Sequence, residues 1–492
     1  MTPAEFLRQP PAQGPTHALT EPQWEALAAD PELPLLALWG EPGVVRAAFQ
    51  DGNALRLVAL AAPEGQYPAL SPARPAAALF ERAVHDLWAL EPVGTQDGRP
   101  WLDHGRWPVL NPLSGRPVRH GGAPPQPEFL PAEGHALHRL PLGPILPGIG
   151  EPAYLHLAVA GEAVVRMEAR LGYAHKGVLA LMPGKSPRAA ARFPARLQAE
   201  ATVAHSLAFA LAAEKATGTE PPPRAVVLRA VMAEIERLSV HLHIWAQVLA
   251  LAGPPALADQ AALARETMLA ASQIAFGHRL LMDRVLPGGV ALDLEERGLS
   301  ILRDALLLLA EDLPRLARAT LRHAGLVEAL TGLGVIPPAL AQDYTAGGPV
   351  ARASGVMVDA RLGPDASPYD ELELEIPLHP EGDAAARLRQ RIAETAESRR
   401  LLAVMLDSLP DGPIITPLPQ RGGEGVALVE GPHGPCMAWL ALDDGGLIRA
   451  AMARDPAWAL WPLAEAAAAG AGLEQLPLLL AGFGLTMSGM DL

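Results

Sequence analysis

The stretch RAVVLRAVMAEIERLSVHLHIWAQVLAL, residues 224–251, sets the architecture of the chain. It contains neither glycine nor proline, and its apolar residues recur at helical spacing, so it predicts one long, largely buried helix. Glu234, Arg237 and His241 stand at positions i, i+3 and i+7 and therefore share one face of that helix. A charged face on a buried helix is expensive unless the charges are paired.

Two interpretations of this charged face stay open. In the first, Glu234, Arg237 and His241, with Arg229 on the same helix, form an ion-pair network that locks the helices together. In the second, the same side chains line a cavity or a proton path. His241 and His243 are not a good metal pair, because residues two apart on a helix point in different directions.

Further Ala- and Leu-rich segments on both sides of this stretch predict a helical bundle. The expected helices cover residues 196–217, 224–251, 256–284, 294–328 and 382–409. Gly- and Pro-containing breaks separate the first four, and residues 410–413 end the last. Strands are expected at 425–429 and 437–442 near the end of the chain, and a β-hairpin is expected over 153–159 and 162–171.

The first part of the chain has a different pattern, with short strand candidates punctuated by Gly, Pro and Asp. Residues 1–115 therefore predict a small α/β domain whose strands, at 35–39, 44–50 and 54–61, form an antiparallel sheet. Helices are expected at 24–29 and 75–87. Residues 116–139 are rich in Pro and Gly and predict a linker, and residues 140–492 form the larger, mainly helical domain. The expected fold class is α+β.

Composition limits the range of functions. The 492 residues carry 39 basic and 54 acidic side chains, a formal net charge of −15, and no Lys/Arg stripe that would suit nucleic acid. Cys436 is the single cysteine, so this chain alone supports neither a disulfide nor an iron–sulfur cluster or Cys-rich zinc site. No signal-peptide pattern or apolar run of membrane-spanning length is found.

The segment GYAHKG, residues 172–177, places His175 and Lys176 between glycines. Taken alone, it predicts either a solvated turn or a site that meets an anion or a redox partner. No CxxC pair, HExxH motif, Walker loop or GxGxxG set accompanies it.

GYAHKG resembles the GYxHRG signature of the nickel–iron hydrogenase large subunit and of its relative, the 49-kDa-type subunit of respiratory complex I. The resemblance continues in order through most of residues 140–492. It is carried by AHSLAFALAAEKATG (204–218), RAVVLRAVMAEIERLSVHL (224–242), PGGVALDL (287–294), GGPVARASGVMVDAR (347–361), SPYDELE (367–373), GDAAARLRQRIAETAESRRLL (382–402) and RDPAWALWPL (454–463).

The N-terminal part carries ERAVHDLWAL (81–90) and GRPWLDHGRWPVLNPL (98–113), which resemble the 30-kDa-type subunit of complex I. The 30-kDa and 49-kDa types are fused in the large subunits of formate hydrogenlyase and hydrogenase-4-type complexes. The whole chain is therefore similar to the fused subunit of a group 4, membrane-bound, energy-converting complex.

The resemblance fails at the metal ligands. Hydrogenases of this family hold nickel and iron through two CxxC pairs, and alignment places Gln198, Ala201, Thr486 and Gly489 at those four positions. These side chains provide no thiolate for a soft dinuclear centre. We therefore expect no nickel–iron centre, no metal bound by this chain and no hydrogenase activity.

The quinone-binding pattern of the complex I subunit is also altered. Leu146 and Gly150 stand where its loop has two histidines, Pro187 falls near its tyrosine, and Leu251 and Leu281 replace an aspartate and a further histidine. Quinone reduction needs a proton donor near each oxygen, and the usual ones are missing.

Lys176 keeps the positive charge that relatives carry near the last iron–sulfur cluster of the small subunit. This sequence also keeps six further residues of the segments that carry the resemblance: His175, His205, Arg229, Glu234, Arg237 and His241. It implies that these residues preserve either the fold and the docking surface or a proton route towards the membrane arm.

The resemblance implies a peripheral-arm oxidoreductase subunit at the cytoplasmic face of the inner membrane. Its expected partners are an iron–sulfur small subunit similar to the cluster-bearing small subunit of complex I, and antiporter-like membrane subunits that move ions. The cluster would belong to the small subunit, and a quinone or another small acceptor would occupy the cavity of this chain. The alternative is a catalytically inactive scaffold or coupling subunit of an antiporter-like ion or transport complex.

Overall fold

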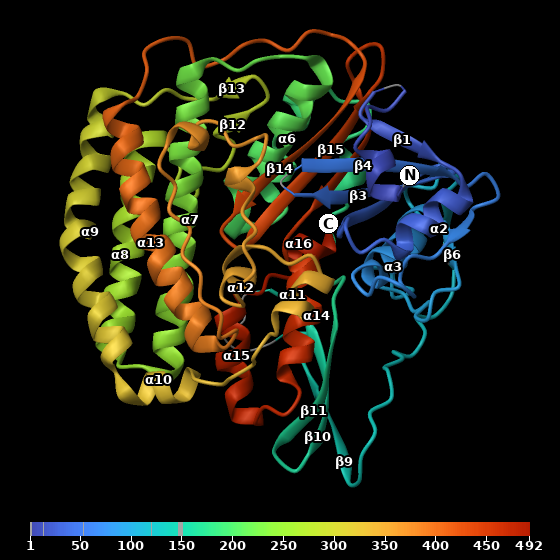
Figure 1. The fold of residues 1–492 in the computed structure, drawn as a ribbon, viewed down its shortest axis with the longest axis horizontal. Helices are drawn as coiled ribbons and strands as arrows, with labels where there is room; N and C mark the ends of the chain where they lie inside the picture. The colour runs from blue at the N-terminus through green and yellow to red at the C-terminus, as the bar shows by residue number, and fades with distance from the viewer. Residues whose placement is uncertain (1, 13, 53, 120, 146–150) are drawn as a thin grey trace.

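A computed structural model describes residues 2–12, 14–52, 54–119, 121–145 and 151–492. In Figure 1 a bundle of long helices lies on one side, the N-terminal unit lies on the other, and the sheet of β14 and β15 runs between them. This mixture of helices and sheets confirms the expected α+β class.

The bundle is built from four helices: α7 (Pro223–Ala252), α8 (Pro255–Phe276), α9 (Glu296–Arg322) and α13 (Ala384–Asp407). Helix α7 is the predicted stretch, and it lies beside α8 and α13. It begins at a proline, whose missing N–H would have no partner in the first turn, and Gly253 follows its last turn. The shorter α10 (Ala324–Leu330) and α15 (Leu476–Phe483) close one end of the bundle (Figure 1).

Three predicted helices differ from the observed ones. The segment 196–217 becomes helical only at α6 (Thr202–Thr217), because Gln198 is extended and 3₁₀ turns precede it. The segment 256–284 ends at Phe276, where Gly277 adopts φ of 71° and caps α8. The segment 294–328 breaks at His323, whose ring nitrogen accepts the N–H of Leu326 and starts α10.

Helix α6 packs on a three-stranded antiparallel sheet of β14 (Gly423–Gly431), β15 (Gly434–Leu442) and β16 (Ile448–Arg454). The helix approaches very closely, because a Cβ at Gly425 would lie 2.1 Å from the carbonyl oxygen of Ala212. Glycine at position 425 of the strand is therefore a steric requirement. The strand candidates 425–429 and 437–442 are confirmed as β14 and β15, whereas β16 was not predicted.

The N-terminal unit contains a four-stranded sheet in the order β1-β4-β3-β2. Its strands are β1 (Thr16–Leu19), β2 (Leu35–Glu41), β3 (Val44–Asp51) and β4 (Ala54–Ala61). Strands β2, β3 and β4 are antiparallel as predicted, but β1 adds parallel to β4. Helices α1 (Pro3–Leu7), α2 (Glu21–Ala29) and α3 (Ala77–Trp88) belong to the same unit, as do the short strands β5 (Gln66–Pro68) and β6 (Glu91–Val93).

The predicted hairpin is present as β10 (Tyr154–Ala160) and β11 (Ala163–Arg170), but it gains a third strand. This strand, β9 (Leu137–Leu142), pairs with β10 and begins inside the segment predicted as a linker. The linker also contributes β8 (Val118–Arg119), which pairs with β7 (Val109–Leu110). The end of residues 116–139 is therefore part of a sheet.

Short elements complete the framework. They are α4 (Val178–Leu181), α5 (Pro187–Ala190), α11 (Pro338–Asp343), α12 (Gly348–Arg352), α14 (Ala457–Ala468), α16 (Ser488–Asp491) and the strands β12 (Val285–Leu286) and β13 (Gly289–Val290). None of the helices in the described part of the chain combines the length and hydrophobicity that crossing a membrane requires.

Candidate functional site

The segment 172–177 is held by residues 491 and 492. The carboxylate of Asp491 accepts the backbone N–H of Gly172 at 2.7 Å and that of Ala174 at 2.6 Å. The backbone oxygen of Leu492 accepts the N–H of Gly177 at 3.0 Å. Burial raises the pKa of Asp491 to about 6 despite these bonds. GYAHKG is thus a clamped turn rather than a freely solvated one.

His175 and Lys176 point to different neighbours. The ring of His175 stacks on Trp107 of the N-terminal unit, with centroids 4.3 Å apart, and burial lowers the pKa of His175. The ammonium of Lys176 donates to the backbone oxygen of Leu197 at 3.0 Å, and burial lowers its pKa as well. The motif therefore joins the N-terminal unit to the segment that precedes α6.

The four positions that the resemblance aligns with metal ligands are all in the interior. Gln198, Ala201 and Thr486 are buried, and Gly489 lies in α16. A Cβ placed on Gly489 would come within 2.3 Å of Cγ of Asp455, a separation that real structures do not show. The carboxylate of Asp455 thus fills the space that a side chain at position 489 would need.

Asp455 forms a buried cluster with His205 and Cys436. Nε2 of His205 lies 2.8 Å from Oδ2 of Asp455 and 3.9 Å from Sγ of Cys436. Burial raises the pKa of the thiol, and the pKa of Asp455 is lowered because its contact with His205 outweighs the effect of burial. Sequence reasoning selected His205 but missed Asp455, whose only signal was its place in RDPAWALWPL.

The charged face of α7 is engaged in a buried network. Glu234 accepts hydrogen bonds from Tyr369 at 2.7 Å and from Ser398 at 2.6 Å, and it pairs with Arg237 at 3.3 Å and Arg361 at 3.2 Å. Burial disfavours its charge, but the two guanidinium groups prevail and hold the pKa of Glu234 at about 2. Glu234 therefore remains ionised at neutral pH.

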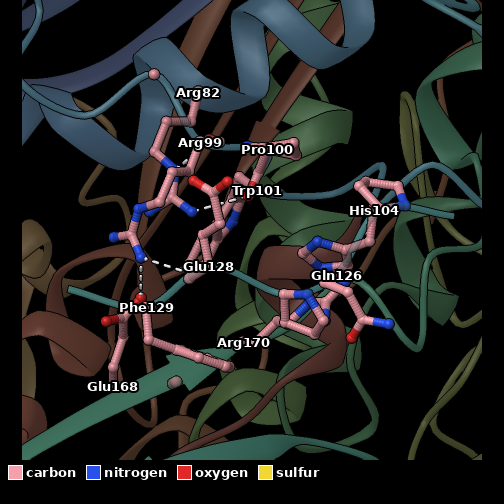
Figure 2. A pocket seen from close by; sticks show the side chains of 14 residues that line it. Arg82, Arg99, Pro100, Trp101, His104, Gln126, Glu128, Phe129, Glu168 and Arg170 are labelled. Atoms are coloured by element: carbon pink, nitrogen blue, oxygen red, sulfur yellow. Dashed lines mark hydrogen bonds and ion pairs between the residues drawn. The ribbon is translucent and has the colours of Figure 1, made fainter. Parts of the chain in front are cut away.

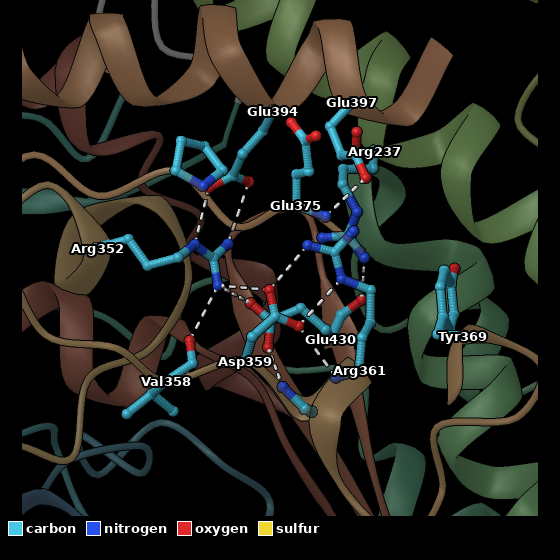
Figure 3. Close-up of polar contacts among 12 residues, drawn as sticks. Arg237, Arg352, Val358, Asp359, Arg361, Tyr369, Glu375, Glu394, Glu397 and Glu430 are labelled. Atoms are coloured by element: carbon cyan, nitrogen blue, oxygen red, sulfur yellow. Dashed lines mark hydrogen bonds and ion pairs between the residues drawn. The ribbon is translucent and has the colours of Figure 1, made fainter. Parts of the chain in front are cut away.

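A third arginine, Arg352, extends this network, as Figure 3 shows. Arg352 pairs with Glu394 at 2.8 Å, with Glu430 at 2.9 Å and with Asp359 at 3.0 Å. Glu394 in turn contacts Nε2 of His241 at 3.0 Å, and burial lowers the pKa of His241 to about 4. His241 is therefore neutral near pH 7.

The network contains residues that the sequence analysis did not select. They are Arg352, Asp359, Arg361, Glu394 and Glu430. The sequence signal that could have indicated these residues is the presence of charged side chains in segments that are otherwise rich in small and apolar residues. Arg229, which was selected, lies apart from Glu234 and pairs with Glu214 of α6, so the four α7 residues do not form one cluster.

A cavity of about 150 Å³ opens between α7 and α8, beside Ala199 and Glu200. Glu200 and Glu236 lie on its wall, and Glu236 accepts the N–H of Val203 at 2.6 Å. Burial raises the pKa of Glu236 to about 8. Ser239 Oγ and Arg265 Nε also face this cavity without a hydrogen-bond partner among the described residues.

The positions aligned with quinone ligands are dispersed. Leu281 lines the cavity between α7 and α8, Pro187 is buried in the first turn of α5, and the side chain of Leu251 is exposed. Leu146 and Gly150 lie outside the described residues. The predicted loss of the usual quinone ligands stays a prediction.

A larger cavity, about 350 Å³, lies where the N-terminal unit meets β11 and residues 125–129 (Figure 2). Arg82 and Arg99 line this cavity, and both form ion pairs within the chain. Arg82 pairs with Asp97, and Arg99 pairs with both Asp97 and Glu168. These bonds tie the linker segment to the rest of the chain, since Arg99 also donates to the backbone oxygen of Glu128.

The helical bundle beside a three-stranded sheet, with the turn at 172–177 held by Asp491, has the fold of a large subunit of the type found in hydrogenases and complex I. Residues 258–422 match the family described as the respiratory-chain NADH dehydrogenase 49-kDa subunit. NADH-quinone oxidoreductase subunit 4 of Thermus thermophilus is 31% identical over 281 residues, which are 57% of this chain and 69% of that protein. The chain belongs to this family of 49-kDa-type and group 4 hydrogenase large subunits.

Two further relatives cover more of the chain. Formate hydrogenlyase subunit 5 of Escherichia coli is 29% identical over 428 residues, 84% of this chain and 75% of that protein. A chain in the structure of the membrane-bound sulfane sulfur reductase, an archaeal respiratory membrane complex, superposes with a TM-score of 0.69 at 25% identity. That match covers 72% of this chain and 98% of the other.

Proposed function

We propose that this chain is a peripheral-arm subunit of a complex I-like, membrane-bound, energy-converting oxidoreductase and that it works without a nickel–iron centre. The observation that carries this proposal is the combination of family membership with ligand positions that provide no thiolate. The relatives named above are subunits of formate hydrogenlyase, of an NADH-quinone oxidoreductase and of a respiratory membrane complex. The proposal includes a peripheral position at the cytoplasmic face of the inner membrane, beside antiporter-like subunits, and the membership of these relatives in membrane complexes supports it.

The packing at Gly489 is a second argument against a nickel–iron centre in this chain. A nickel–iron centre needs soft ligands at positions 198, 201, 486 and 489, and Asp455 occupies the space beside the last of them. The residues present do not fit the group, so no hydrogen chemistry is assigned to this chain.

Docking on an iron–sulfur small subunit would involve the turn at 172–177. The backbone of the turn is bound to the carboxylate of Asp491, and Lys176 in this turn is exposed. A cation close to a cluster in the partner would stabilise the reduced cluster and raise its potential. The cluster would belong to the small subunit, because one cysteine cannot hold it.

The acceptor would use the cavity between α7 and α8. Its unpartnered Ser239 hydroxyl and Arg265 N–H are donors suited to a carbonyl oxygen, as in a quinone headgroup or another small acceptor. The carboxyl of Glu236, with a pKa of about 8, is a suitable proton donor on the same wall.

A specific observation favours the scaffold alternative. Glu234 is held ionised by two arginines and His241 is held neutral, so neither group exchanges a proton easily near pH 7. This part of the charged face supports a structural role more than a proton path. In that case the chain would be a catalytically inactive scaffold or coupling element for an antiporter-like module.

Native purification of the tagged chain from membranes, followed by mass spectrometry, tests the proposal. We expect a small subunit with intact cluster cysteines together with antiporter-like subunits. Lys176→Glu should weaken recovery of the small subunit, whereas Lys185→Glu, a lysine outside the turn, should not. Recovery of membrane subunits without a cluster-bearing partner would contradict the redox function and support the scaffold.

A further inference from the structure

Three potential metal ligands from distant parts of the sequence meet in the core. His205 lies in the first turns of α6, Cys436 lies on β15, and Asp455 directly follows β16. Their donor atoms, one from each residue, all lie within 4.8 Å of one another, and all three side chains are buried. Since 231 residues separate His205 from Cys436, no spacing motif in the sequence could indicate this cluster.

The separations are close to those of a metal site. Tetrahedral zinc, with bonds of about 2.0–2.3 Å, places its ligand atoms about 3.2–3.8 Å apart. The distance from His205 Nε2 to Cys436 Sγ is 3.9 Å, and that from Nε2 to Asp455 Oδ2 is 2.8 Å. A cation would enter by pushing the carboxylate and the imidazole apart by about half an ångström.

The cluster is also held by its surroundings. Oδ1 of Asp455 accepts the backbone N–H of Ala457 at 2.8 Å, which leaves Oδ2 directed at His205. Cys436 lies on the central strand of its sheet, between β14 and β16. Outer contacts that orient each ligand are a regular feature of protein metal sites.

A buried polar oxygen lies in the turn that precedes α6, the helix that carries His205. Oε1 of Gln198, in the turn before the helix, is buried and has no hydrogen-bond partner within the described ranges. A buried carbonyl oxygen without a partner costs free energy, so such an atom is a common sign of a missing ion or water.

We propose that His205, Cys436 and Asp455 bind a single divalent cation of the zinc class. One nitrogen, one sulfur and one oxygen ligand suit zinc, and the charges of a thiolate and a carboxylate balance its two positive charges. Three protein ligands leave a fourth position for water or another group. None of the three proposed ligands stands at one of the four nickel–iron positions, although Asp455 lies against Gly489. The site does not depend on the proposed redox function.

Metal analysis of the intact chain tests the site. The protein is purified with a tag that lacks histidine and cysteine, and zinc and nickel are measured by ICP-MS. We expect about one zinc per chain, and loss of most of it in Cys436→Ser and Asp455→Asn. Asp444→Asn, a change of the same chemistry in an exposed loop, should keep the zinc. Wild-type protein without zinc, or equal zinc in Cys436→Ser, would overturn the proposal.

Cobalt substitution gives a test that needs no variant. Because Cys436 is the single cysteine, a thiolate-to-cobalt charge-transfer band in the Co²⁺-loaded wild-type chain can arise only from this residue. We expect the band in wild type, and its absence overturns the site even if the variants fail to fold. Stoichiometric nickel, measured in the same samples, would instead contradict the proposed function, so the two failures are distinguishable.

Discussion

Phe80 of α3 stacks on Trp458 of α14, with ring centroids 4.4 Å apart and ring planes at 10°. This contact joins the N-terminal unit to the large domain. It is supported by the ion pair of Arg46 with Glu424 at 3.0 Å and by the tilted pair of Trp39 and Trp439. The buried apolar residues of the two parts form one continuous cluster.

The first prediction concerns this shared core. Trp458→Ala should lower the free energy of unfolding by about 3–5 kcal/mol, because it removes a large ring and leaves a cavity. Trp458→Phe keeps a stacked ring and should cost much less. Chemical denaturation followed by circular dichroism measures both. Equal stability of Trp458→Ala and wild type would show that the interface contributes little.

The second prediction concerns the network around Glu234. Glu234→Gln removes the charge that compensates Arg237 and Arg361, and it should destabilise the chain by about 3–5 kcal/mol. Exposed Glu474→Gln is the matched control and should be neutral. A stable Glu234→Gln chain that assembles normally but loses ion coupling would instead favour the proton path.

The pH dependence of this effect has a definite sign. The pKa of Glu234 is lowered from 4.5 to about 2, so its contribution to stability is fully present above pH 4.5. It is lost as the pH falls through 2. Thermal unfolding should show the largest gap between wild type and Glu234→Gln above pH 4.5 and a shrinking gap below it.

The third prediction is that the contribution of Glu236 to stability depends on pH with the opposite sign to that of Glu234. The pKa of Glu236 is raised to about 8, so the folded state binds a proton that the unfolded state releases above pH 4.5. The stability that this group contributes is therefore present below pH 4.5 and is lost as the pH rises to about 8. Glu236→Gln, which mimics the neutral carboxyl, should gain stability relative to wild type between pH 5 and pH 9. A constant difference across that range would contradict the raised pKa.

Much of the fold could be predicted because its signals are local. Helix α7 follows from its apolar periodicity and flanking prolines, and β2, β3 and β4 follow from short apolar runs between turns. The helix ends at Phe276 and His323 could not be placed, because they depend on a left-handed glycine and on one imidazole cap. The parallel pairing of β1 depends on tertiary contacts that no local pattern encodes.

The candidate site was only partly accessible from the sequence. Glu234, Arg237 and His241 could be selected as a charged face from the sequence, because helical spacing places them on one side of α7. Their partners, among them Tyr369, Ser398 and Glu394, are distant in the chain, so these contacts need the folded structure. Asp455 was missed for the same reason, because its meaning comes from contacts with His205 and Gly489.

The last prediction uses the contact between Gly489 and Asp455. Gly489→Ala would ordinarily favour a helix by about 1 kcal/mol. Here the new Cβ would lie 2.3 Å from Cγ of Asp455, so the carboxylate must leave His205. We expect a net loss of about 1–3 kcal/mol in the free energy of unfolding. Gly121→Ala, where nothing lies within 4 Å, is the control and should be neutral.

A double-mutant cycle shows whether that loss arises from the carboxylate itself. In an Asp455→Ala background the space beside position 489 is open, so Gly489→Ala should cost little there. The difference between the two backgrounds is the coupling energy of the pair, and unfolding midpoints of the four chains measure it. An equal cost in both backgrounds would mean that another neighbour rejects the side chain. Strong coupling would show that a side chain at 489 and the carboxylate of Asp455 compete for the same space.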